Sequence, residues 1–296
     1  MEINAKILTP GDEILSRNID DYPEGIIIPI DKPYRWTSAD VIRKVKFAAI
    51  RHFGKKNLKV GHAGTLDPLA TGVLLVCIGK ATKLAEWLQS HHKEYVAGVT
   101  FGATTPSYDL EKEIDRFFPY DHITAEGVQA ALPAFIGEQD QIAPLFSAKS
   151  VDGVRAYELA RKLHKEGKTL DDAAEELIRV SRINITELEM TAFTAGKESS
   201  STAQASPSSD SSEGHEEVSK ASSRINVTDN SALGLPRAVI RMACSKGTYV
   251  RAFARDLGEA LGSGAHLDSL QRSGSGIFRV ENALTVDQTI TILSHQ

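Results

Sequence analysis

A glycine-rich stretch with one carboxylate, residues 60–72, is the part of the sequence best suited to chemistry. Its letters, VGHAGTLDPLATG, contain three glycines and the acid Asp67. Glycines let another backbone approach closely, and Pro68 stiffens the chain just after the acid. Leu66 and Leu69 are placed to anchor the stretch in a hydrophobic core. These residues predict a rigid loop that presents a carboxylate, although an aspartate before a proline is also a common turn former.

Other kinds of reactive site find little support. No Gly-Lys-Ser/Thr sequence closes the glycine-rich stretch, so it does not match a phosphate-binding loop. The two cysteines, Cys77 and Cys244, each lie in an apolar or strand-like run and are expected to be buried thiols of a reducing compartment rather than metal ligands. The N-terminus lacks the features of a signal peptide, and no run of about 18 apolar residues occurs. We therefore expect a cytoplasmic protein.

The elements around the loop are predicted from apolar periodicity. Residues 25–30, 72–78 and 93–101 are predicted to form buried strands. Between the first two, Thr37 or Ser38 can cap a helix. The apolar stripe of this helix consists of Val41, Ile42, Val45, Ala48, Ala49 and Phe53.

Further elements follow along the chain in a mixed order. Helices are predicted at 80–88, 124–135, 154–166 and 171–178, and strands at 182–190 and 238–244. The regular alternation of strand and helix that would demand a parallel sheet is missing. The predicted fold class is therefore α+β.

Charge is distributed unevenly. The formal net charge is −5, which is unfavourable for binding a nucleic-acid backbone. Residues 43–59 nevertheless carry basic side chains and no acidic one: Arg43, Lys44, Lys46, Arg51, Lys55, Lys56 and Lys59. Such a stripe can bind phosphates even when the total charge is negative, and a solvated helix face is the alternative interpretation.

One segment has the composition of a disordered insert. Residues 199–223 contain eleven serines and a single large aliphatic side chain, Val218, too little apolar surface to offset the entropy of an ordered chain. We place the insert at about 195–235, within a main domain of residues 25–280. Residues 1–24 are then expected to be an N-terminal extension and residues 281–296 a short C-terminal tail.

The stretch GHAGTLDPLATG resembles the signature of the TruB family of tRNA pseudouridine synthases. Six further blocks agree with the family in type and order: DKP at 31–33, KEY at 93–95, PLFSA at 144–148, RAYELAR at 155–161, CSKGTYVR at 244–251 and GAHLDSLQRSGSGIF at 264–278. The resemblance covers residues 25–280 apart from the serine-rich insert. It implies the pseudouridine synthase catalytic fold, with a mixed, largely antiparallel sheet flanked by helices and loops.

The resemblance implies that Asp67 is the catalytic carboxylate. Pseudouridine formation breaks the N1–C1′ bond of uridine, turns the uracil and rejoins it through C5 without net redox change, so no cofactor and no metal are expected. Attack on C1′, attack on the uracil ring and removal of a sugar proton to give a glycal all stay open. Arg251 is the family's candidate for pairing with the carboxylate, and a surface cation on a helix is its alternative.

Four more residues match family active-site positions. Tyr95 would stack on the base that leaves the RNA helix, and His62 would lie near the extruded nucleotide. Lys32 would support the loop beside the active site, and Leu267 would pack on the uracil face. Each also has an ordinary structural interpretation: sheet packing, a structural histidine, a surface lysine and a core leucine.

Contacts with RNA outside the reacting base are less closely defined. Asp109 falls in a loop where the family carries an acidic residue, but Pro106 and Tyr108 depart from the family's usual form there, so an RNA contact and a structural contact both stay open. The basic stripe contributes the other candidate RNA contacts: Arg43, Lys44, Lys46, Lys55 and Lys56.

The implied substrate is the T-arm stem-loop of tRNA, modified at position 55. We expect a monomer without an obligatory protein partner and without membrane association. About eighteen residues follow Phe278, too few for the small C-terminal RNA-binding domain that many family members carry. Alternative functions are a tRNA-binding folding chaperone, a pseudouridine synthase for another RNA, and a nucleosidase that releases free uracil.

Overall fold

The computed structural model describes residues 3–144, 150–151, 154–155, 180–197 and 225–294. The predicted helix at 171–178 and the serine-rich residues 199–223 lie outside the described residues. The predicted helix at 154–166 is described only at its start, where β10 (Val154–Arg155) pairs with β9 (Ser150–Val151) as a strand.

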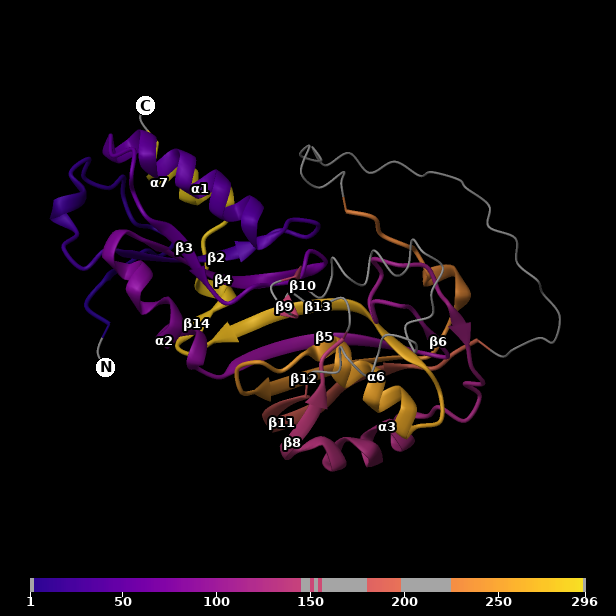
Figure 1. Ribbon diagram of the computed structural model, residues 1–296. Helices are drawn as coiled ribbons and strands as arrows, with labels where there is room; N and C mark the ends of the chain where they lie inside the picture. The colour runs from indigo at the N-terminus through magenta and orange to yellow at the C-terminus, as the bar shows by residue number, and fades with distance from the viewer. Residues whose placement is uncertain (1–2, 145–149, 152–153, 156–179, 198–224, 295–296) are drawn as a thin grey trace.

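A mixed sheet of ten strands forms the centre of the molecule (Figure 1). Its order is β1 (Lys6–Ile7), β2 (Ile26–Lys32), β4 (Ala70–Ile78), β13 (Ala265–Ser275), β5 (Lys93–Phe101), β12 (Arg237–Cys244), β11 (Val180–Thr194) and β8 (Gly137–Ile142), with β3 (Val60–Ala63) beside β4 and β14 (Phe278–Arg279) beside β13. Only the pairs β1–β2 and β4–β13 of this sheet are parallel. The α+β class and the largely antiparallel sheet are confirmed.

The helices gather at the two ends of this sheet (Figure 1). Helix α1 (Ser38–Phe53) lies beside α7 (Val286–Ile292) at the end formed by β2, β3 and β4. Helices α3 (Ala125–Ala131) and α6 (Val250–Ala260) cover the end formed by β5, β11 and β13. The other helical segments of the described part of the chain are η1 (Ile19–Asp21), η2 (Gly79–Leu84), α2 (Ala85–Ser90), η3 (Leu132–Phe135), η5 (Ser231–Leu233) and η6 (Val280–Asn282). A separate two-stranded sheet pairs β6 (Ala103–Thr104) with β7 (Arg116–Phe117).

Helix α1 has the start that its sequence predicts. Thr37 caps it: the Thr37 side chain accepts a hydrogen bond from the main chain of Asp40, and the Asp40 side chain accepts one from the main chain of Thr37. This reciprocal pair satisfies two main-chain donors that have no partner within the helix. The helix ends at Gly54, whose φ of 63° is the left-handed conformation that terminates helices. The predicted apolar stripe is buried apart from Ile42, which is partly exposed.

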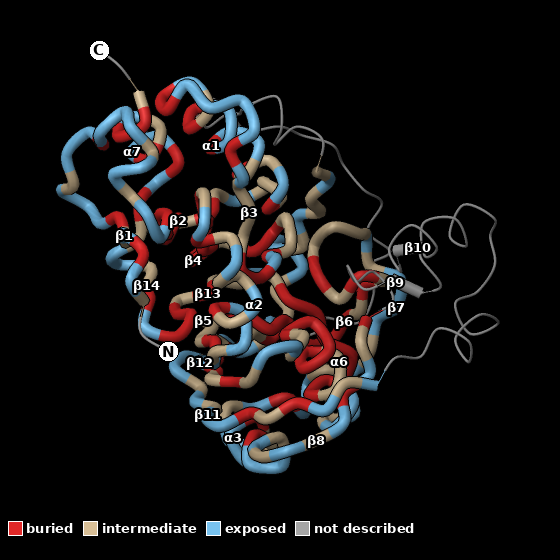
Figure 2. Tube along the Cα trace, turned by 60° about the vertical axis from the view of Figure 1, so that its left-hand side comes forward, coloured by how far each residue is buried: buried red, intermediate tan, exposed pale blue. Residues whose placement is uncertain are grey.

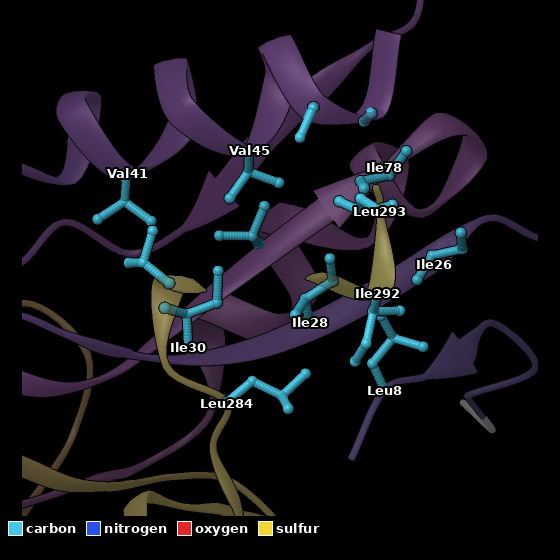
Figure 3. Close-up of a cluster of buried hydrophobic side chains, with 14 of the residues drawn as sticks. Leu8, Ile26, Ile28, Ile30, Val41, Val45, Ile78, Leu284, Ile292 and Leu293 are labelled. Atoms are coloured by element: carbon cyan, nitrogen blue, oxygen red, sulfur yellow. The ribbon is translucent and has the colours of Figure 1, made fainter. Parts of the chain in front are cut away.

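Two hydrophobic clusters make up most of the core. The first lies between α1, α7 and strands β2 and β4, where Figure 3 shows Val41 and Val45 of the helix facing Ile28 and Ile30 of the sheet. The second lies between the sheet and helices α3 and α6. In Figure 2 the buried residues, in red, lie along the sheet and on the helices that pack against it. Among the described residues, only Tyr95 and Leu270 pack against both clusters.

Described residues before position 25 and after position 280 contribute to the first cluster. Near the N-terminus, β1 extends the sheet beside β2, and Leu8 is fully buried. Near the C-terminus, Leu284 donates from its main chain to the Pro29 carbonyl and is 1% exposed, while Ile292 of α7 is also buried. Figure 3 shows Leu8, Leu284 and Ile292 in the same cluster. Leu8, Leu284 and Ile292 of these terminal segments are therefore part of one core.

The flanks of the serine-rich insert have defined positions. The main chain of Lys197 donates to Gly234, and that of Thr228 donates to Leu110. The Arg35 side chain donates to the Ile225 carbonyl at 2.8 Å. Of the expected insert at about 195–235, residues 198–224 lie outside the described part of the chain, and both flanking segments pack against the main domain.

Replacing Leu284 with alanine tests whether the C-terminal segment is part of the core. The buried side chain would leave a cavity, and Leu284→Ala is expected to lower the free energy of unfolding by about 2–5 kcal/mol. Thermal unfolding and urea titration measure the loss. The control Glu281→Ala changes an exposed side chain nearby and should leave stability within about 0.5 kcal/mol of the parent. Equal stability of the two variants would show that the segment is a dispensable tail.

Candidate active site

The Asp67 loop (residues 64–69) connects β3 to β4 and is fixed by helix α1. The Ser38 hydroxyl at the start of α1 donates to the Leu66 carbonyl at 3.1 Å and accepts from the Leu66 main-chain nitrogen at 2.9 Å. Leu66 and Leu69 are buried, as the sequence predicted. The loop is therefore held both by its apolar side chains and by its main chain.

Arg251 holds the carboxylate of Asp67. It lies in the first turn of α6 and is 5% exposed, and its Nε donates to Asp67 Oδ2 at 2.9 Å. Its Nη1 donates to the Ser107 carbonyl at 3.0 Å. Burial opposes the charge of the guanidinium, but the neighbouring carboxylates of Asp67 and Asp109 raise the pKa of Arg251. The arginine is a fixed cation of the site, and its alternative as a surface cation is excluded.

Asp109 is the second carboxylate beside this arginine. Its Oδ2 lies 3.7 Å from Arg251 Nε, and its Oδ1 accepts from the Ser107 hydroxyl and from the Glu111 main chain. Burial raises the pKa of the Asp109 carboxyl, while Arg251 and the hydrogen bonds act in the opposite direction. With its side chain 9% exposed, Asp109 is placed to orient Arg251, and this position favours the structural alternative over an RNA contact.

Lys32 supports the loop from the other side. It is fully buried, and its ammonium group donates to the carbonyls of Pro33, Trp36 and Pro68 at 2.9, 2.6 and 3.2 Å. Burial lowers the pKa of Lys32 to about 7, and the nearby Asp67 carboxylate is the strongest opposing influence. A lysine that holds the carbonyl next to Asp67 fits the supporting role implied by the family resemblance.

A cavity of about 360 Å³ opens beside Asp67, within the usual size range of ligand pockets. Its walls include Tyr95, Leu270 and Arg251 together with two further cations, Lys93 and Arg272. The turn from Ser245 to Tyr249 borders the same space. Asp67, Tyr95 and Arg251, which are far apart in sequence, are thus brought to one cavity.

Tyr95 lies on β5 with its ring against both hydrophobic clusters. Burial raises the pKa of its phenol, and the positive charge of Arg272 opposes this shift. The hydroxyl therefore keeps its proton at neutral pH. Its place in the cavity is compatible with stacking on a base.

Two residues with family-based assignments do not line the 360 Å³ cavity. Leu267 does not line the 360 Å³ cavity; it is 3% exposed within the second hydrophobic cluster and borders only a smaller space behind Arg251. Leu270, three residues later, lines the main cavity beside Tyr95. His62 lies on β3, paired with Val76, and is not among the residues that line the cavity.

His62 keeps features of a structural residue. Its Nδ1 is buried without a hydrogen-bond partner among the described residues, and burial lowers the pKa of the ring. A neutral ring within a strand needs no charged partner. We therefore assign no contact with the nucleotide to it.

The candidate RNA contacts on and after α1 are exposed. Arg43 pairs with Asp40 at 2.7 Å. Lys44, Lys46, Lys55 and Lys56 have no acidic partner among the described residues, which leaves their charges available to phosphates. Among all the residues that the structure describes, no three His, Cys, Asp or Glu side chains are grouped to hold a metal ion. No helix of these residues has the length and apolar character needed to cross a membrane.

Comparison with known proteins decides the family. The sequence profile of the TruB family pseudouridylate synthase N-terminal domain matches residues 51–204. The chain is 45% identical over 267 residues to tRNA pseudouridine synthase B of Phocaeicola vulgatus, covering 90% of this chain and 92% of that protein. This chain belongs to the TruB family. The protein of the same name from Flavobacterium johnsoniae is 38% identical over 90% of this chain and 95% of its own length.

Solved structures agree with the TruB family fold. A chain in the crystal structure of a Cbf5–Nop10–Gar1 complex superposes with a TM-score of 0.54 at 23% identity, over 96% of this chain. A chain of an H/ACA RNP bound to a substrate RNA containing 2′-deoxyuridine superposes with a TM-score of 0.53 at 20% identity. The present chain spans about 60% of the length of these two chains. At such identities the likeness concerns the fold alone.

Asp109→Asn tests the second carboxylate of this TruB family site. The amide keeps the shape of the Asp109 side chain but removes the negative charge beside Arg251. The kcat for uridine isomerisation should therefore fall about 10-fold, which corresponds to the free energy of one charged hydrogen bond. Because the pKa of Asp109 is raised, protonation at falling pH should bring the parent protein toward the rate of the variant. Single-turnover rates from pH 5 to 8 measure this convergence.

The control for this experiment is Asp115→Asn, which changes an exposed carboxylate of the following segment. It should keep the parent rate and the parent pH profile. A parent-like kcat for Asp109→Asn would contradict the shared-arginine geometry.

Proposed function

We propose that this chain isomerises a uridine of tRNA to pseudouridine, at position 55 of the T loop. The observation that carries the proposal is the position of Asp67: a carboxylate with 35% exposure at the edge of a 360 Å³ cavity, held at 2.9 Å by the buried Arg251. An arginine at this distance orients a carboxylate through a charge-assisted hydrogen bond. The type of reaction is inferred from the family to which the chain belongs.

The reaction uses what the cavity offers. The N1–C1′ bond breaks, the detached uracil turns, a C5–C1′ bond forms, the proton on C5 leaves to solvent, and N1 takes up a proton. The three routes considered for this family, attack on C1′, attack on the ring and formation of a glycal, all require a carboxylate next to the sugar, which Asp67 provides. Electrons and atoms balance without an oxidant or a reductant, so the chemistry needs no redox cofactor.

The walls of the cavity suit a base that has left its stack. Flipping a nucleotide costs a few kcal/mol of lost stacking, part of which an aromatic ring can restore. Tyr95 presents such a ring next to Asp67, and Leu270 supplies a flat apolar contact beside it. We assign the leucine contact with uracil to Leu270 in place of Leu267.

The surface that grips the tRNA includes the basic stripe of α1. The first residue of this helix, Ser38, binds the Asp67 loop. Because a helix rises about 1.5 Å per residue, its basic side chains lie up to about 20 Å from the reacting nucleotide. Phosphates of the T arm are the ligands that match this charge. The proposal includes a monomeric protein that acts in the cytoplasm without a partner.

Tritium release tests the reaction and the carboxylate together. The purified chain, without added cofactor, is incubated with an unmodified tRNA transcript carrying tritium at C5 of uridine. The parent protein should release tritium from the T loop, and Asp67→Asn should lower the rate by at least about 10³-fold while still binding tRNA. The control Asp287→Asn, an exposed acid of α7, should keep the parent rate.

Other outcomes of this experiment point to the alternatives. Tight tRNA binding without tritium release would indicate a folding chaperone or another RNA substrate. Release of free uracil would indicate a nucleosidase. Tritium release that persists in Asp67→Asn would remove Asp67 from the catalytic role.

Charge reversal tests the basic stripe. Lys44→Glu with Lys46→Glu should weaken tRNA binding about 10-fold and reduce the slope of log K against log salt by about 1 per lost phosphate contact. Filter binding between 50 and 300 mM salt measures both. The control pair Lys197→Glu with Arg241→Glu makes the same charge change at exposed positions on and just beyond β11 and β12. Equal effects of the two pairs would show that only net charge matters.

A further inference from the structure

Arg272 is a second buried arginine at the cavity, and no role follows for it from the sequence blocks. It lies on β13 and is 2% exposed, and it is the largest of the fully buried side chains among the described residues. A charged group is seldom this deeply buried without a carboxylate. Arg272 has no ion-pair partner among the described residues, so something other than a salt bridge must explain its place.

The guanidinium of Arg272 binds main-chain carbonyls of the Asp67 loop. Its Nη2 donates to Gly64 at 3.2 Å and its Nη1 to Thr65 at 3.3 Å, while Nε donates to Val73 of β4 at 2.7 Å. One planar group thus joins both sides of the loop. Thr65 is two residues before Asp67, so the position of these carbonyls limits where the carboxylate can lie.

The same guanidinium reaches the cavity, which it lines together with Asp67 and Tyr95. Its positive charge lowers the pKa of the Tyr95 phenol against the larger effect of burial. Its charge also adds to burial in lowering the pKa of Lys93 to about 8. Arg272 therefore contacts the loop that carries the carboxylate and lines the cavity together with the tyrosine that faces it.

Two glycines of the loop region make this approach possible. Gly72 pairs with Arg272 in the register of β4 and β13, and a Cβ at Gly72 would lie 2.2 Å from the Arg272 carbonyl oxygen. Gly64 has a φ of 96°, a conformation that other residues adopt only with strain, and a Cβ there would lie 3.7 Å from Arg272 Nη1. Gly72 is thus explained by a close neighbour, and Gly64 by its backbone conformation.

We propose that Arg272 is a positioning residue for the isomerisation: it fixes the Gly64 and Thr65 carbonyls, and with them Asp67, at the cavity that it lines together with Tyr95. The inference rests on the function proposed above. Arg272 acts through these groups and does not react itself. A misplacement of about 1 Å at a reacting group can cost about 100-fold in rate, which sets the size of the expected effect.

Arg272→Lys tests the geometry while keeping the charge. A lysine lacks the planar fork of the guanidinium and cannot reproduce the directions in which Arg272 donates to the Gly64, Thr65 and Val73 carbonyls. Under single-turnover conditions with C5-tritiated tRNA, kcat should fall about 10- to 100-fold while the Kd for tRNA stays within about 2-fold of the parent. The matched control is Arg279→Lys, because Arg279 also donates to main-chain carbonyls, those of Gly276 and Phe278, but does not line the cavity. It should keep the parent kcat.

A second variant keeps the test valid if Arg272→Lys is unstable. Gly64→Ala leaves Arg272 in place but strains the loop at φ 96° and turns its carbonyl. It should lower kcat in the same way, and the double variant should cost little more than the larger single loss, because both changes break the same contact. Rates are divided by the folded fraction, measured by circular dichroism.

Each outcome has a defined meaning. A parent-like kcat of the folded fraction in Arg272→Lys, or strictly multiplicative losses in the double variant, would overturn the positioning role and leave Arg272 as a core residue. Absence of tritium release by the parent protein would instead contradict the proposed function, so the two failures are distinguishable.

Discussion

The carboxylate of Asp67 reaches the cavity because buried cations hold its loop from three sides. Lys32 donates to the carbonyl just after the aspartate, Arg272 donates to two carbonyls before it, and Arg251 binds the carboxylate itself. These cations come from β2, β13 and α6. In the register of the sheet, Gly72 lies between Lys32 on one neighbouring strand and Arg272 on the other. The shape of a short loop is thus set by segments far away in the sequence.

Burying these cations costs stability. Main-chain carbonyls offset only part of the lost hydration, and the pKa of Lys32, lowered from 10.5 to about 7, reflects the remainder. Because the unfolded chain binds this proton more tightly, the contribution of Lys32 to stability rises with pH between about 7 and 10.5. The folded state gives up some free energy to hold polar groups in fixed directions. Fixed polar groups need no reorganisation when charge develops in a reaction.

Local patterns predicted the elements that carry the site. The caps and apolar stripe of α1 and the apolar runs of β2, β4 and β5 fixed the surroundings of Asp67, because those signals lie within a few residues of each other. The leucine at the cavity could not be predicted in this way. β13 contains an irregularity between Leu267 and Ser269, where its register with β5 shifts. This shift breaks the simple alternation of faces, so which leucine faces Tyr95 depends on the neighbouring strand. The burial of Arg272 could not be predicted for a related reason, since a cation in a strand is ordinarily an exposed residue.

The cavity lies where two hydrophobic clusters meet. Tyr95 and Leu270 are the residues that pack against both, and both line the cavity. Each cluster has its own helices, α1 and α7 on one side and α3 and α6 on the other, so each is closely packed without the other. Asp67 comes from the loop anchored in the first cluster, and Arg251 from the helix that covers the second. Their ion pair at 2.9 Å therefore joins the two halves at the cavity. A base that enters there meets walls whose positions are set by two packed cores, which explains how a site assembled from distant segments can be rigid.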